Sequence, residues 1–477
     1  MVEFFVNELA ADRYISTHLY GAIDRIDQSD VGIEDASDIF ATSTSALLHN
    51  MSENYTMERK EWIQRKEMAL MKQKLSPFET YVALLKGYCA IGIFVMPKAF
   101  LNGGWAASAM MEIASGLISS ICVVKLVESG LKYKLYSYSL IVEKAFGCNG
   151  RFILDFMISM TQFSFALSYV AFMVESGKST VDKMFDIDTN PWVYATAIIC
   201  ILTPMAWERD ITKFAFTFLI GCLLIVWGLV VVSFYATGVL YEEKKFGPDI
   251  QALNTNGYLT TLGMTIYSFE GIGIVMPVMH SCENPEKFTG IFICAMVTLV
   301  ITIISFSELC YLTWGSALDK PIVTEMLPSD KSYVILTKLL ISINLLCTYP
   351  IVIKPANKIF EKWTFRCKNL RKKSKPRYWL KNFQRFLVVF IGAYMGVELA
   401  SKIDKFLGLL GSLFCAPLAL TIPSLIHLKL VAKTKSEKII DIIIAIVSFA
   451  VLIFSTHQSI SNWNDPSVSH DHGVTSD

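Results

Sequence analysis

The stretch Thr265-Ile-Tyr-Ser-Phe-Glu-Gly-Ile-Gly-Ile-Val-Met-Pro277 lies inside a long apolar segment, yet it carries the carboxylate Glu270 beside two glycines, Gly271 and Gly273. A charge near the centre of a bilayer costs about 3 kcal/mol or more. Glycines followed by a proline weaken a helix that must satisfy its own backbone in lipid. A membrane segment tolerates these features where its broken backbone lines a polar cavity, so the stretch indicates a substrate site in a transporter.

The composition is that of a polytopic membrane protein. Of the 477 residues, 53% are hydrophobic and 18% are charged, and the mean hydropathy is +0.45. A soluble chain carries about a quarter charged residues, and here the apolar residues also form long runs. The net charge of +1 gives no reason to expect nucleic acid as a partner.

The chain divides into three predicted parts. Residues 1–76 are polar and are expected to form a partly disordered cytosolic tail, residues 77–460 a transmembrane domain, and residues 461–477 a tail outside the cell or in an organelle lumen. We expect about eleven spans of roughly 20 residues each. They are predicted at Glu79–Leu101, Gly104–Val127, Phe152–Ser176, Pro191–Trp207, Phe214–Leu240, Tyr258–Met279, Gly290–Trp314, Ser332–Phe360, Phe386–Ala400, Phe406–Leu428 and Ile439–His457.

Basic residues predict the orientation, because loops rich in Lys and Arg stay on the cytosolic side. Such residues concentrate in the N-terminal tail and in the connections after the second, eighth and tenth predicted spans, whereas the alternate connections carry few. Eleven alternating spans put all the basic segments on one side. The N-terminus is therefore expected to be cytosolic. The basic segments are Arg59–Lys74, Lys132–Lys144, Lys362–Arg385 and Lys429–Lys438.

A short internal repeat links the first and sixth predicted spans. The first contains Ile91-Gly-Ile-Phe-Val-Met-Pro97 and the sixth contains Ile272-Gly-Ile-Val-Met-Pro277. The two spans are five apart, so they cross the membrane in opposite directions. Inverted repeats of five helices, each with an interrupted first helix, produce this arrangement.

At these residues the chain resembles the amino acid/auxin permease family, and most of all its proton-coupled, vacuolar or lysosomal-type amino acid transporters. The family's first span reads like L-K-G-N-I-G-T-G-x-x-x-x-P, matched in part by Leu85–Pro97, and its sixth reads like F-E-G-I-G-x-x-x-P, matched by Phe269–Pro277. The resemblance implies an all-α, LeuT-like fold, a five-plus-five inverted repeat with broken helices one and six. It also implies carriage of amino acids across a membrane.

The first-span match departs from the family pattern at two places. Tyr88 replaces the usual Asn, which is associated with sodium binding in some relatives, so the resemblance gives little support to sodium coupling. Ala90 and Ile91 replace the first Gly and the Thr of Gly-Thr-Gly, and a β-branched residue stiffens the backbone. Unwinding in the first span could therefore be smaller or shifted, and the bulk of Tyr88 could narrow the pocket or change the substrate.

The candidate substrate site combines both interrupted helices. A broken helix offers free N–H groups and a positive dipole end to a carboxylate, while freed carbonyls near Tyr267 could accept from an ammonium. The alternative is that the glycines only allow close helix packing and that the aromatic residues only pack, rather than gate the site. The candidates are Gly87, Tyr88, Cys89, Ala90, Ile91, Gly92, Tyr267, Ser268, Phe269 and Gly271.

Glu270 has three possible roles. It could bind and release a coupling proton, because burial disfavours a charged carboxylate. It could face the substrate ammonium directly. It could instead be a structural carboxylate that holds loose backbone or Lys86 in place.

Charged residues nearer the predicted span ends are expected to pair or to reach the membrane interface. Glu112, Glu175, Lys354 and Glu398 are in this group. The seven histidines do not cluster, and the sequence suggests neither a metal site nor a cofactor.

We therefore expect a secondary transporter of small neutral amino acids, coupled to protons, in the plasma membrane or an endolysosomal or vacuolar membrane. One alternative is a transporter-like sensor of amino acids, and another is a carrier of a different small amine or organic acid. An enzyme is not expected, since no nucleophile elbow, metal cluster or nucleotide loop is present. The sequence does not decide the oligomeric state.

Overall fold

The computed structural model describes residues 75–88, 91–208, 215–328, 331–365 and 375–464. The two predicted tails lie almost entirely outside these residues. The long helices are α3 (Pro77–Tyr88), α4 (Met96–Gly103), α5 (Trp105–Tyr133), α6 (Tyr138–Phe185), α7 (Pro191–Trp207), α8 (Ala215–Glu243), α9 (Tyr258–Ser268), α10 (Ile272–Ser281), α11 (Phe288–Trp314), α12 (Ser332–Thr364), α13 (Lys375–Leu399), α14 (Ile403–Leu410), α15 (Ile422–Leu430) and α16 (Lys435–Ser461). Short helical turns are η1 (Ile91–Phe94), η3 (Pro285–Lys287), η4 (Gly315–Ala317), η5 (Val323–Met326), η7 (Ala400–Lys402), η8 (Gly411–Cys415), η9 (Pro417–Thr421) and η10 (Asn462–Asn464).

The described residues form no β-strand, and eight of their helical segments are long and apolar enough to cross a membrane. The predicted all-α polytopic membrane class is therefore confirmed. The number of spans stays a prediction, because residues 378–430 form one helical segment that includes the predicted ninth and tenth spans, and α7 is shorter than the eight.

Helix α16 shows how the chain meets lipid. It buries polar side chains such as Asp441 and Ser448 and exposes apolar ones such as Ile443, Ile446 and Phe454. This is the reverse of a soluble helix, since backbone and side-chain polar groups must be satisfied inside the protein when lipid surrounds it.

The first and sixth predicted spans are both interrupted, as expected. The first forms α3, η1 and α4, and the sixth forms α9 and α10. The second half of the first span, α4, packs along α9, which is the first half of the sixth, while α3 packs along α10. The two broken helices therefore run in opposite directions, in agreement with the predicted inverted repeat.

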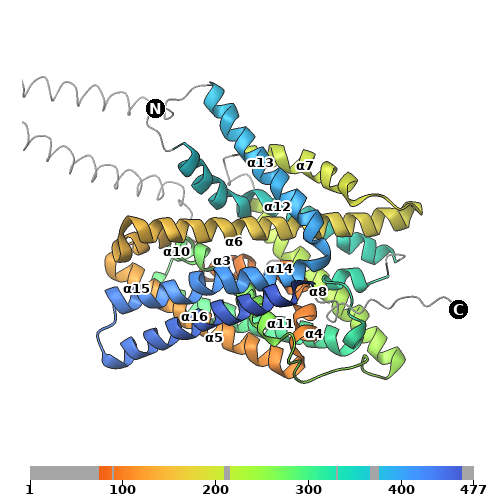
Figure 1. The fold of residues 1–477 in the computed structure, drawn as a ribbon, viewed down its shortest axis with the longest axis horizontal. Coiled ribbons are helices and arrows are strands. Elements are labelled where there is room, and N and C mark those ends of the chain that lie inside the picture. The colour runs from red at the N-terminus through yellow and green to blue at the C-terminus, as the bar shows by residue number, and fades with distance from the viewer. Residues whose placement is uncertain (1–74, 89–90, 209–214, 329–330, 366–374, 465–477) are drawn as a thin grey trace, which may run out of the picture. The chain divides into compact units, whose positions relative to one another are not determined.

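Helix α6 is longer than the predicted third span, Phe152–Ser176. It begins at Tyr138, and Gly147 bends it with a left-handed backbone (φ 72°, ψ −167°). A residue with a side chain rarely adopts this conformation, so the glycine joins a short helix to the long one. Figure 1 shows α6 extending past α12, with α7 and α13 packed against it on one side.

The predicted tenth span, Phe406–Leu428, is not one regular helix. Two π-helical turns, η8 and η9, separate α14 from α15. Here α14 and η8 approach α9 backbone to backbone: a Cβ on Gly411 would overlap the carbonyl oxygen of Gly263, and a Cβ on Gly263 would overlap that of Gly408. Small residues allow such close packing in membranes.

We predict that Gly411→Ala destabilises the protein by about 1–3 kcal/mol or more, because the added methyl group forces η8 away from α9. Thermal unfolding of the purified protein in detergent measures the effect. Gly238→Ala is the matched control, since no atom lies within 4 Å of a Cβ at Gly238 in α8. Equal unfolding temperatures for the two variants would contradict the close packing.

Candidate substrate site

The two helix breaks differ in detail. Helix α3 ends at Tyr88, and a 3-10 turn at Ile91–Phe94 leads into α4, with the Val95 N–H donating to the Gly92 carbonyl at 2.9 Å. In the sixth span, α9 closes with the Glu270 N–H donating to the Tyr267 carbonyl at 3.1 Å. Neither α4 nor α10 has a side-chain cap at its start. The Lys98 N–H in α4 donates to the Val95 carbonyl and the Ile274 N–H in α10 to the Gly271 carbonyl, both at 3.0 Å, and a proline follows Met96 in α4. The N–H groups left without a helical acceptor are therefore those of the first residues, Met96 in α4 and Ile272 in α10.

A small cavity lies between the breaks, and four of the predicted site residues line it. Its volume is about 10 Å³, which is room for about one water-sized sphere. Ile93 of η1, Phe165 of α6 and Ile303 of α11 also line it, and the sequence analysis did not include them among the site residues. The full lining is Tyr88, Gly92, Ile93, Phe165, Tyr267, Ser268 and Ile303.

Aromatic rings keep the cavity small. The Tyr88 ring lies directly over Gly271, where a Cβ would come within 2.8 Å of it. The ring of Tyr267 packs against Phe165 with centroids 4.6 Å apart, and Gly92 faces the Tyr267 ring, 3.9 Å from a Cβ built there. The hydroxyl groups of Tyr88 and Tyr267 are buried and form no hydrogen bond with the residues that the structure describes.

Other predicted residues lie beside the cavity rather than on its wall. Gly87 packs against the side chain of Ile274 in α10, and the Phe269 ring packs near Gly116 of α5. Cys89 and Ala90 lie outside the described residues, and so does the side chain of Ile91.

Glu270 is buried, with 5% of its surface exposed, but it is not on the cavity wall. Within the described part of the chain its carboxylate forms no ion pair or hydrogen bond. Lys86, which one of its predicted roles involved, points its Nζ towards Asn344 Oδ1 of α12 at 3.4 Å. Because Lys86 Nζ lies near Asn344 and not near Glu270, the structure favours a role for Glu270 other than holding Lys86 in place.

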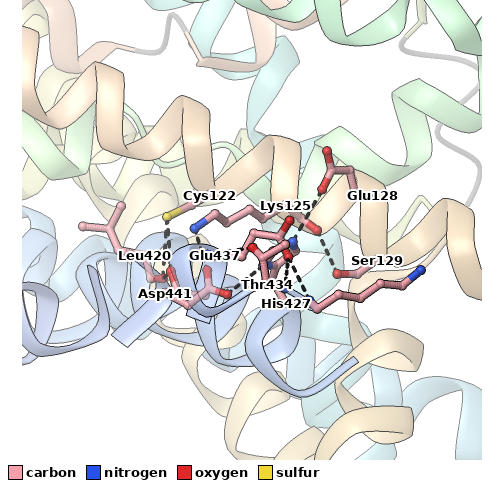
Figure 2. Close-up of polar contacts among 11 residues, drawn as sticks. Cys122, Lys125, Glu128, Ser129, Leu420, His427, Thr434, Glu437 and Asp441 are labelled. Atoms are coloured by element: carbon pink, nitrogen blue, oxygen red, sulfur yellow. Dashed lines mark hydrogen bonds and ion pairs between the residues drawn. The ribbon is translucent and has the colours of Figure 1, made fainter. Parts of the chain in front are cut away.

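A second polar group, which the sequence analysis did not identify, joins α5, α15 and α16 (Figure 2). Asp441 is fully buried, accepts from Lys125 Nζ at 2.5 Å and lies 2.7 Å from His427 Nδ1. His427 Nε2 lies 3.5 Å from Glu128, whose side chain is 54% exposed. His427 and Asp441 are 14 residues apart in the chain, so no local motif joins them.

Two of the predicted cytosolic connections, those after the second and tenth predicted spans, lie near this polar group. Lys132, in the last turn of α5, donates from Nζ to the carbonyl of Leu430, the last residue of α15, at 2.6 Å. The connections after the second and tenth predicted spans therefore lie on one side, as the distribution of basic residues required.

We predict that Asp441→Asn destabilises the protein by about 3–5 kcal/mol, because it leaves Lys125 and His427 without their shared buried carboxylate. Thermal unfolding in detergent at neutral pH is the measurement. Glu128→Gln serves as the control and should change stability little, since Glu128 is exposed. If Asp441→Asn unfolds at the wild-type temperature, the group does not hold the three helices together.

Solved structures share this arrangement of helices. An inward-facing Mhp1 matches with a TM-score of 0.55 at 11% identity, covering 82% of this chain and 92% of Mhp1. A manganese transporter of Eremococcus coleocola matches with a TM-score of 0.52 at 8% identity, covering 80% and 86%. The fold is thus that of the LeuT-like membrane transporters.

Residues 73–461 match the family model described as Transmembrane amino acid transporter protein, and the chain belongs to this family. It is a multi-pass membrane protein of a transporter family and not of an enzyme family. Vacuolar amino acid transporter 3 of Saccharomyces cerevisiae is 29% identical over 397 residues, covering 82% of this chain and 57% of the relative. The Proton-coupled amino acid transporter-like protein pathetic of Drosophila melanogaster is 26% identical over 379 residues, covering 73% and 76%.

Vacuolar amino acid transporter 4 of Saccharomyces cerevisiae is also 29% identical, over 418 residues. The chain spans 57% and 58% of the length of the two yeast proteins.

Proposed function

We propose that this protein is a secondary active transporter of small neutral amino acids that works by alternating access around the two helix breaks. The observation that carries the proposal is the cavity between them, lined by residues of both broken helices. The uncapped starts of α4 and α10 offer N–H groups and a positive dipole end to a substrate carboxylate. The Ile266 and Tyr267 carbonyls already accept from the Phe269 and Glu270 N–H groups. The next carbonyl, that of the cavity-lining Ser268, is the acceptor that α9 offers to the substrate ammonium.

The lining of the cavity supports a small neutral substrate. A space of about 10 Å³ is smaller than any amino acid, so the Tyr88 and Tyr267 rings must move when a substrate enters. Both rings are neutral and the lining carries no charged side chain. A small neutral side chain is therefore the best fit, and a large or charged one is the poorest.

Proton coupling is proposed through Glu270. Its carboxylate is buried in the break, two residues past the end of α9, and has no partner among the described residues to stabilise a charge. An uncompensated buried charge is costly, so such a group exchanges protons when its surroundings change. The Drosophila relative is named as proton-coupled, which supports a proton gradient as the driving force here.

The relatives' names and the distribution of basic residues support a location. The yeast relatives are described as vacuolar, so we place this protein in an endolysosomal or vacuolar membrane, with the plasma membrane as the alternative. The N-terminus and the end of the bundle that contains Lys125 and Asp441 would face the cytosol.

The purified full-length protein in liposomes tests the proposal. We predict that an inward pH gradient drives uptake of one or more small neutral amino acids above the level in empty liposomes. A sensor would instead bind an amino acid, seen as an upward shift in unfolding temperature, without flux. Binding without flux, or flux of amines and organic acids only, would contradict the transport of amino acids.

We predict that Glu270→Gln nearly abolishes uptake driven by a pH gradient while exchange of labelled for unlabelled substrate continues, because a neutral amide cannot carry the proton but leaves the cavity walls intact. Both are measured in the same liposomes. Glu243→Gln, at the exposed end of α8, should behave as wild type. Undiminished gradient-driven uptake by Glu270→Gln would remove Glu270 from the coupling.

A further inference from the structure

A stripe of buried polar side chains runs along one face of α5. Its members are spaced by four, three and four residues, which places them on one side of a helix. All are 4% exposed or less: Ser108, Glu112, Ser115 and Ser119. In a helix surrounded by lipid, such a face is expected to pack against other helices of the bundle.

The stripe packs against α9, the first half of the broken sixth span. Ser115 Oγ lies 2.9 Å from Thr265 Oγ1 of α9. Seven residues earlier, Ser108 and Thr261 meet beside Gly103: a Cβ on that glycine would lie 2.5 Å from Ser108 Oγ and 2.9 Å from Thr261 Oγ1. Glu112 lies between these two contacts on the same face of α5.

Glu112 is fully buried, and neither of its carboxylate oxygens has a hydrogen-bond partner among the residues that the structure describes. The sequence analysis expected this residue to pair or to reach the membrane interface, and that expectation is wrong. The reason is that α5 starts at Trp105 and turns this face inward, onto α9. An ionised carboxylate without a partner at such a place costs several kcal/mol.

The charged or titratable groups on the helices around this face do not compensate Glu112. Helix α9 carries no charged residue. Lys98 of α4 donates from Nζ to the Leu318 carbonyl at 2.7 Å, and His427 of α15 pairs with Asp441. Glu308 of α11 and His280 of α10 form no hydrogen bond or ion pair with Glu112 either.

We propose that Glu112 is a proton-binding site whose occupancy depends on the packing of α5 against α9. This rests on the proposed function and adds to it a second carboxylate, away from the helix break. While the two helices pack closely, Glu112 holds its proton. When α9 moves during alternating access, water enters the seam, the O–H bond of the acid breaks, and water takes the proton and leaves a carboxylate. Closure reverses the step.

Such a site links the protonation of Glu112 to one conformation of α9. The protonated form stabilises the packed state and the ionised form stabilises the open one, and the linkage acts equally in both directions. Substrate that reorders the α9 end of the cavity would then change the affinity of Glu112 for a proton.

Infrared spectroscopy of the purified full-length protein tests the site without requiring transport. We expect wild type to show the carbonyl stretch of a protonated carboxyl group at neutral pH, and we expect Glu112→Gln to lose one component of that band. Ser119→Ala is the matched control, since Ser119 lies on the same buried stripe and has no titratable proton in this range. A band that is identical in wild type and Glu112→Gln overturns the proposal.

Transport then tests the coupling. In liposomes, Glu112→Gln should lose the stimulation of uptake by a pH gradient while keeping substrate exchange, and Glu112→Asp, which keeps a titratable group, should restore part of it. Full stimulation in Glu112→Gln overturns the coupling role even if the infrared band is present. If wild type itself moves no amino acid, the proposed function fails, and the infrared result still decides whether Glu112 binds a proton.

Discussion

In a membrane, a helix that stops halfway across must place its unpaired peptide groups somewhere other than lipid, and this requirement shapes the centre of the protein. The breaks between α3 and α4 and between α9 and α10 leave helix ends near the middle of the bundle. Other helices surround them, since Phe165 of α6 and Ile303 of α11 close the space between. The cavity follows from the backbone first, and the side chains decide only its size.

Glycines make the enclosure tight. At Gly271 the Tyr88 ring lies on bare backbone, and at Gly263, Gly408 and Gly411 two helices touch through their main chains. Because α9 meets α14 and η8 through backbone at these glycines, rearranging side chains cannot loosen this contact.

Much of this could be predicted from the sequence because the signals were local. The Phe269-Glu-Gly-Ile-Gly273 run and the similar run in the first span predicted the positions of both breaks. The fourth predicted span, Pro191–Trp207, coincides with α7. Two departures from the predicted spans have physical causes. A bend at Gly147 lets α6 begin before the predicted third span. The π turn at Gly411–Cys415 lies where η8 meets the backbone of α9. Phe165 and Ile303 were missed because an apolar residue on an apolar helix gives no sign of the cavity it faces.

The buried carboxylates discussed above are of two kinds: Asp441 has charged or polar partners, and Glu112 and Glu270 have none among the described residues. Asp441 lies within hydrogen-bond distance of Lys125 and His427 where α5, α15 and α16 meet. Glu112 and Glu270 are also buried and have no such partner among the described residues. A buried ion pair offsets part of the cost of removing its charges from water, whereas burial of a carboxylate without a partner favours its neutral form. Both uncompensated carboxylates adjoin the broken sixth span, Glu112 facing α9 and Glu270 at the break itself, so the proposed proton exchange and the proposed helix movement involve the same part of the protein.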